Sequence, residues 1–433
     1  MTVVSHTGQS HHPALRSDNI TFAPGAGGGV SMGMMGLGFV LLIAALGIGF
    51  SGAGGMPLVH ALAAVHVGVM SVLAMCLGAT FFLMVFHLMG AGWTSTLRRQ
   101  FENVAAFLPF AWLGLAVILG IELAKGGVQF AWLKPEHMHN PVLVAKSGFY
   151  YWPGHMKEGA LPLFFILRTA IYGAFWTFLV SRLRGLSLAQ DRTGDRALSA
   201  RAKFMCAWGM PLFALSIAFC AFDYLMSLDY SFFSTMWGVY YFAGAAFSGV
   251  AVVTFVLARL VKSGKVQGAV TSEHFHDLGK IMFSFTVFWA YISFCQYFLY
   301  WYANIPEETA FYVHRSGPEW KMLGVFLMIG HFGLPFVYLV SRDVKKNLFL
   351  ISVACLWFVL VHVADIFWIV RPMTYAGGGQ ADPMMSGIWL DLLGIVGVLL
   401  VFAGFLVKKV SGGVLVAVND PFIQEGLEHR NYV

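Results

Sequence analysis

Charged residues are scarce in this chain. Asp, Glu, Lys and Arg make up 11% of its 433 residues, whereas a typical soluble domain has about 25%. Only five cysteines occur, and none lies in a CxxC or CxxCH motif, which argues against structural zinc, c-type haem attachment and a disulfide framework. The chain also lacks a phosphate-binding GKS/T motif, a Ser/His/Asp nucleophile arrangement and a nucleic-acid-binding module. Hydrophobic residues reach 58%, with 40 Phe and 13 Trp, so the composition predicts an integral membrane protein.

Ten apolar stretches are each long enough to cross a bilayer, which takes about 20 residues as a helix. We therefore expect an all-α polytopic membrane protein with ten transmembrane helices. The predicted spans are 31–51, 60–90, 104–123, 159–182, 203–226, 232–260, 280–302, 320–341, 346–370 and 386–408.

Lysine and arginine are distributed unevenly between the connections of these spans. Most of them fall on one side of the membrane if the N-terminus is cytoplasmic, so the positive-inside rule places both termini in the cytoplasm. We interpret 183–202 as a solvated cytoplasmic connector. The aromatic-rich loops 124–158 and 303–319 lie on the opposite side, and we expect them to pack against another subunit or against the chain's own helices.

Several spans contain a charge or an imidazole, although a central charge costs about 2.5–3.5 kcal/mol on insertion scales. His362 and Asp365 are three residues apart and therefore share a helix face. We predict that His331, His362 and Asp365 relay protons, because a relay needs titratable groups within hydrogen-bond reach. The predicted pathway also includes a second polar cluster of Arg168 and Asp223, with His87 near the cytoplasmic end.

A blander interpretation is that these polar groups only hold neighbouring helices together. Glu122 and Asp391 lie near span ends, where capping or snorkelling explains a carboxylate. A transmembrane b-type haem would need two histidines on different helices at matching depth. His331 and His362 are the best available pair, and we disfavour this alternative; no metal site is predicted.

Three segments resemble a known family: HDLGKIMFSFTVFWAYISFCQYFLYWYANIPEETAFY (276–312), FDYLMSLDYSFFSTMWGVYYFAG (222–244) and AKSGFYYWP (145–153). They are similar to the F subunit of bacterial alternative complex III, a quinol-oxidising respiratory assembly. This subunit belongs to the wider family of polysulfide-reductase and formate-linked nitrite-reductase membrane anchors. The resemblance implies two four-helix bundles, made of helices 2–5 and 6–9, with one flanking helix at each end. The corresponding divisions are a polar tail (1–30), the first flanking helix and first bundle (31–226), the second bundle (227–370), the last flanking helix (371–408) and a cytoplasmic tail (409–433).

The resemblance also implies a place in the bacterial inner membrane and a set of partners. These are a paralogous membrane C subunit, an iron–sulfur subunit, multihaem and monohaem cytochromes, lipids and, in some assemblies, a terminal oxidase. Haems and iron–sulfur clusters then reside in the partners, and no cofactor is bound covalently to this chain. By analogy, a quinone such as menaquinone would bind in the first bundle near His66, Arg168 and Asp223. The rival interpretations are a stand-alone secondary transporter and a purely structural membrane anchor.

Overall fold

The computed structural model describes residues 12–374 and 383–431, and this part of the chain is mostly helical. Ten of its helical segments are long and apolar enough to cross a membrane, which confirms the predicted class of multi-pass all-α membrane protein. The spans are α2 (Gly28–Ser51), α3 (Leu58–Met89), α4 with α5 (Arg98–Ala105 and Leu108–Lys125), α7 (Leu163–Thr193), α8 (Ala197–Tyr224), α9 (Trp237–Lys262), α10 (Ser272–Ala303), α12 with α13 (Pro318–Leu327 and Leu334–Val340), α15 (Leu348–Val370) and α16 (Ile388–Ser411).

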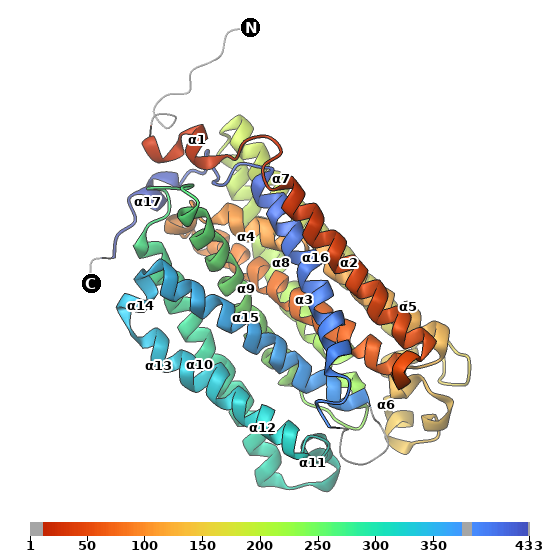
Figure 1. The fold of residues 1–433 in the computed structure, drawn as a ribbon. Helices are drawn as coiled ribbons and strands as arrows, with labels where there is room; N and C mark the ends of the chain where they lie inside the picture. The colour runs from red at the N-terminus through yellow and green to blue at the C-terminus, as the bar shows by residue number, and fades with distance from the viewer. Residues whose placement is uncertain (1–11, 375–382, 432–433) are drawn as a thin grey trace.

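The short helices gather at the two ends of the spans (Figure 1). One end carries the first and the last described residues together with α1 (Ser17–Ile20), α14 (Arg342–Lys346) and α17 (Ile423–Leu427). We call this the terminal end. The opposite end carries α6 (Pro141–Tyr151) and α11 (Pro306–Val313), and we call it the loop end.

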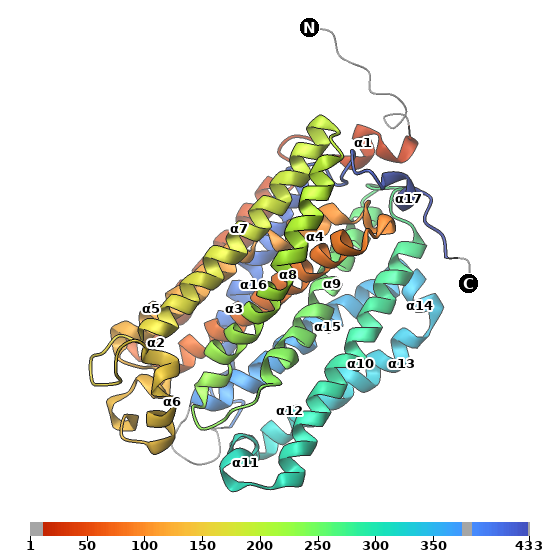
Figure 2. The same cartoon turned by 180° about the vertical axis from the view of Figure 1, so that it is seen from behind.

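Helices α3 and α9 form the centre of the molecule, and they are the two most buried spans. They pack against each other, while α2 packs along α16 at the periphery, and Figure 2 shows the same arrangement from behind. The central contact depends on glycine. A Cβ atom on Gly78 would lie 1.8 Å from the Ala245 carbonyl oxygen, and one on Gly249 would lie 2.5 Å from the Ala79 nitrogen. Small residues at such contacts let the two backbones approach closely within a bilayer.

The segment 183–202, predicted to be a solvated connector, is instead mostly helical. Helix α7 continues to Thr193 and α8 begins at Ala197, which leaves only 194–196 as the connection. The extension is held by the rest of the chain: Asp191 pairs with Arg99, and the Asn419 side-chain amide donates to the Asp191 carbonyl over 2.8 Å. Helix α7 passes through Gly185 and ends before Gly194, whose φ of +67° is the left-handed conformation that commonly follows a helix C-terminus.

The aromatic-rich loop 124–158 packs against the chain's own helices, which is one of the two arrangements expected from the sequence. Phe130, Trp132, Tyr150 and Tyr151 are all buried. The rings of Trp132 and Tyr150 stack with their centroids 4.2 Å apart. This loop therefore closes the loop end beside α7 and α8 instead of offering these rings to a partner.

Candidate functional site

Asp365 is the centre of a buried polar cluster between α9, α10 and α15. Its Oδ1 accepts a hydrogen bond from the Tyr240 hydroxyl, and its Oδ2 accepts one from the Trp289 indole nitrogen over 3.2 Å. All three side chains are largely shielded by the surrounding helices. The carboxylate thus joins three helices, and two of its oxygen lone pairs are already used by protein donors.

His331 lies beside this cluster on an irregular part of its helix. Residues Met328–Gly333 form a π-helical turn between α12 and α13, and such turns occur frequently at functional sites. The His331 ring centroid is 3.6 Å from that of Trp289 and 4.6 Å from that of Phe247. Neither ring nitrogen has a hydrogen-bond partner among the described protein groups.

His362 is also buried without a hydrogen bond of normal geometry at either ring nitrogen. Its ring packs against Phe247 at 5.8 Å, and a Cβ atom on Gly244 would lie 3.2 Å from it. The backbone of Ser71 on α3 lies near the ring. No ion pair or hydrogen bond joins His362 to Asp365 in the described part of the chain, so their shared helix face does not by itself make them a pair.

A second buried cluster joins α7 to α8, as predicted for Arg168 and Asp223. The guanidinium donates to both carboxylate oxygens, with Nε to Oδ2 at 2.9 Å and Nη2 to Oδ1 at 2.6 Å. Tyr172 donates a third hydrogen bond to Asp223 over 2.7 Å, and Arg168 Nη1 donates to the Phe149 carbonyl over 2.7 Å. This is the bidentate geometry that makes arginine–carboxylate pairs strong, and it leaves the carboxylate well satisfied.

His66 lies on α3 near this second cluster. Its Nδ1 is 3.2 Å from Gln129 Oε1, its ring packs edge-on against Tyr224, and its Nε2 has no hydrogen-bond partner among the described groups. The neighbouring Glu122 accepts hydrogen bonds from three consecutive backbone N–H groups, those of residues 128–130. Glu122 therefore organises the loop after α5, in agreement with its interpretation as a capping residue.

His87 lies apart from both clusters, near the last turn of α3 at the terminal end. A different group of polar residues gathers at that end around Asp277 of α10. This carboxylate is bonded to Lys280 at 3.0 Å and to His429 of the C-terminal segment at 2.7 Å. The C-terminal segment thus packs over the terminal end of α10.

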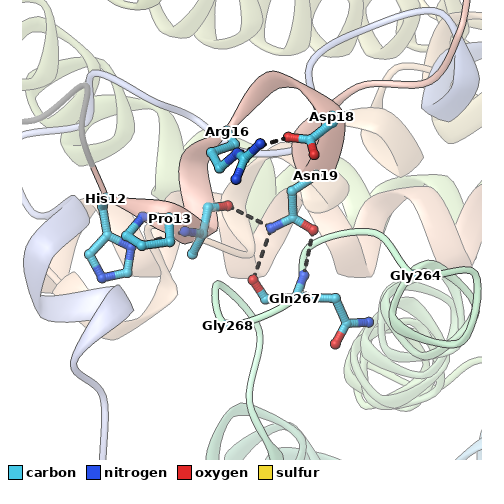
Figure 3. A pocket seen from close by; sticks show the side chains of 9 residues that line it. His12, Pro13, Arg16, Asp18, Asn19, Gly264, Gln267 and Gly268 are labelled. Atoms are coloured by element: carbon cyan, nitrogen blue, oxygen red, sulfur yellow. Dashed lines mark hydrogen bonds and ion pairs between the residues drawn. The ribbon is translucent and has the colours of Figure 1, made fainter.

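A pocket of about 450 Å³ also lies at the terminal end (Figure 3). Asn19 crosses it, donating to the Ala14 carbonyl over 2.7 Å and to the Gln267 carbonyl over 2.9 Å. The Gln267 backbone N–H donates back to Asn19 Oδ1 over 2.8 Å. None of the predicted site residues lines this pocket, and its polar groups tie α1 to the loop after α9.

Sequence reasoning missed the two donors that hold Asp365. Tyr240 and Trp289 lie in aromatic-rich spans where many rings face lipid, and no spacing rule sets these two apart. The π-helical turn had a possible signal, because Gly330, Gly333 and Pro335 surround His331 and Pro335 has no N–H to continue an α-helical ladder. Comparison with known proteins adds no further identification: no protein-family model matches the chain, and no curated protein matches its sequence.

Proposed function

We propose that this chain is an integral membrane subunit of a quinol-oxidising respiratory complex of the alternative complex III type. In this role it contributes a proton-conducting route, while haems and iron–sulfur clusters in partner subunits carry the electrons. The observation that supports the proposal best is the Asp365 cluster. Its two donors, Tyr240 and Trp289, come from the two segments that resemble the F subunit, 222–244 and 276–312.

The proposed architecture is two four-helix bundles. Helices α3, α5, α7 and α8 contact one another in sequence and would form the first bundle; α9, α10, α12 with α13, and α15 would form the second. Helices α2 and α16 would flank them. The proposed location is the bacterial inner membrane with the terminal end in the cytoplasm, where positively charged segments are retained.

In the proposed route, protons pass through the second bundle by way of His331, His362 and Asp365. Two buried imidazoles whose ring nitrogens lack a hydrogen bond of normal geometry support this role, because poorly paired buried polar groups are costly and are retained where they are used. Arg168 and Asp223 would form a second, more tightly bonded cluster, and His87 would lie toward the cytoplasmic side. A quinone near His66 in the first bundle would have to bind through His66 Nε2, since Asp223 already accepts three hydrogen bonds.

The transporter alternative is less well supported. Secondary transporters commonly carry interrupted helices at corresponding positions in their two halves. The π-helical turn interrupts the third helix of the proposed second bundle, whereas its counterpart in the first bundle, α7, is continuous from Leu163 to Thr193. A structural anchor would explain the Arg168–Asp223 pair, but not the two buried imidazoles that lack a hydrogen bond of normal geometry.

Purification of the tagged protein in a mild detergent tests the proposal. Copurified haem absorbance and quinol oxidation support the complex, whereas a colourless single polypeptide contradicts it and supports a transporter. In an assembled complex, His362→Ala and Asp365→Asn are expected to lower the number of protons moved per electron. His137→Ala is the matched control, because this histidine lies outside the spans, where it contacts Tyr230 and Glu136 at the loop end. An unchanged stoichiometry in both assembled variants would refute the proton role.

A further inference from the structure

A cavity of about 960 Å³ lies in the loop-end half of the chain, and the proposed function gives it no occupant. Its walls come mainly from α10, α11, α12 and α15, and many of the lining side chains are aromatic, including Trp237, Trp289, Phe311, Trp320 and Trp368. It adjoins the Asp365 cluster, because Asp365 and Tyr240 also line it.

One side of the cavity opens on the surface between α10 and α12. The lining residues Tyr291, Phe294 and Met328 are 62%, 64% and 62% exposed. They belong to membrane-spanning helices, so their exposed faces meet lipid and not water. A molecule that enters from this side must therefore be soluble in the membrane.

The inner wall carries polar groups that form no hydrogen bond of normal geometry with the described residues. The indole nitrogens of Trp237 and Trp368 are buried and have no acceptor among the described protein groups, and Trp237 as a whole is only 2% exposed. The Ser293 hydroxyl and the Gln296 side-chain oxygen also lack a hydrogen bond of normal geometry. An indole N–H can only donate, so the occupant that fits these two groups presents acceptor oxygens.

We propose that this cavity binds a quinone-class lipid: a planar ring with two carbonyl or hydroxyl oxygens and a long apolar tail. The aromatic walls suit the ring, the indole N–H groups suit its oxygens, and the opening between α10 and α12 leaves a path for the tail. The choice of a quinone rests on the proposed function. The site differs from the one predicted near His66, Arg168 and Asp223, since none of these residues lines the cavity.

A phospholipid head group fits less well. Its phosphate would need a cation, and two cations line the cavity: Lys321, which is exposed, and the buried Arg315, whose guanidinium already donates to three backbone carbonyls. These are the carbonyls of Trp368, Phe311 and Ile369, at 2.9, 2.6 and 2.6 Å.

Photolabelling with an azido-substituted short-tail menaquinone analogue, followed by mass spectrometry of the labelled peptides, tests the proposal. Label is expected in α10 and α12 of the wild-type protein. Gly324→Leu should reduce it to background, because Gly324 lines the cavity and an added Cβ would lie 3.7 Å from Trp368 Nε1 without a clash. Gly120→Leu is the matched control. Gly120 lies on another membrane helix, α5, and a Cβ atom there would meet nothing within 4 Å. Trp368→Phe keeps a ring but removes the unpaired N–H, and should weaken labelling without filling the cavity.

Label confined to peptides around His66 and Arg168, or label in α10 and α12 that survives Gly324→Leu, would overturn the proposal. Recovery of phospholipid alone in solvent extracts of the purified protein, with no competition by unlabelled menaquinone, would also overturn it. These results differ from failure of the proposed function. If the protein purifies without haem subunits yet is labelled in α10 and α12, the quinone site is supported and the proposed complex is refuted. If an active complex is not labelled in these helices, only the quinone site is refuted.

Discussion

Tyr240→Phe and Trp289→Phe offer a direct test of how a proton reaches Asp365. Each change removes one hydrogen bond from the same carboxylate. A tyrosine hydroxyl can donate and accept, whereas an indole N–H only donates. A proton can therefore pass to or from Asp365 through Tyr240, while Trp289 can only hold the carboxylate in place.

We expect one variant to lose more stability and the other to lose more proton transfer. Hydrogen bonds between membrane helices contribute about 0.6 kcal/mol on average and about 1.7 kcal/mol at most. Tyr240→Phe should therefore lower the free energy of unfolding by about 0.6–1.7 kcal/mol. Trp289→Phe loses a similar hydrogen bond and also leaves space beside His331, whose ring centroid is 3.6 Å away. Lost core volume of this kind adds about 1 kcal/mol or more. We expect Trp289→Phe to be the less stable variant and Tyr240→Phe to be the one that loses proton transfer.

Stability can be followed with a thiol-reactive fluorescent dye during thermal or denaturant unfolding in detergent. Four cysteines are buried and Cys295 is partly accessible, so a Cys295→Ala background confines the signal to unfolding. Proton transfer is measured as protons moved per electron in the reconstituted complex. The reasoning is refuted if Trp289→Phe lowers this ratio as much as Tyr240→Phe does, or if Tyr240→Phe leaves it unchanged.

Three further changes test other parts of the structure. Gly78→Leu should destabilise the protein by about 3 kcal/mol or prevent its accumulation. Overpacking costs about 1–3 kcal/mol, and here the added atom meets a backbone carbonyl of α9. The loss is measured by thiol labelling or by the yield of protein in membranes. Arg168→Gln should cost about 3–5 kcal/mol in the same assay, since it leaves the Asp223 carboxylate buried without its cation, and a loss below 1 kcal/mol would contradict the buried pair. His429→Ala should change stability by at most about 1 kcal/mol, yet speed proteolysis of the C-terminal segment, because it removes the hydrogen bond to Asp277.

The ten spans could be predicted because the bilayer imposes one rule on every segment that crosses it. Backbone polar groups must be satisfied within the segment, so a long apolar stretch becomes a helix whatever its neighbours are. The prediction was wrong where a helix leaves the bilayer. Helix α7 continues eleven residues beyond the predicted end at 182, to Thr193. There the helix contacts water and the C-terminal segment in place of lipid, so hydrophobicity no longer indicates where the helix ends.

The candidate site could be predicted only in part. The cost of charge in hydrocarbon singled out His331, His362 and Asp365 from sequence alone, and it also singled out Arg168 with Asp223, which the structure brings together. The donors to Asp365 could not be predicted in this way. They lie 125 and 76 residues away along the chain. A tyrosine or tryptophan in an aromatic-rich span carries no free-energy penalty comparable to that of a charge, so its presence does not indicate whether it faces a hydrogen-bond partner or lipid.

The buried cations of the described residues have structural explanations. Four arginines pair with carboxylates: Arg98 with Asp420, Arg99 with Glu102 and Asp191, Arg168 with Asp223, and Arg371 with Asp391. Arg315 and Lys345 instead donate to carbonyls in the last turns of α15 and α13, which carry negative partial charge. Burial lowers the pKa of both groups, and these carbonyls favour their charged forms. The ring nitrogens of His331 and His362 form no ion pair and no hydrogen bond of normal geometry with the described groups, although the Ser71 backbone lies near the His362 ring. Because helix packing alone accounts for the other groups, these two imidazoles are the side chains whose retention in the membrane most requires a function.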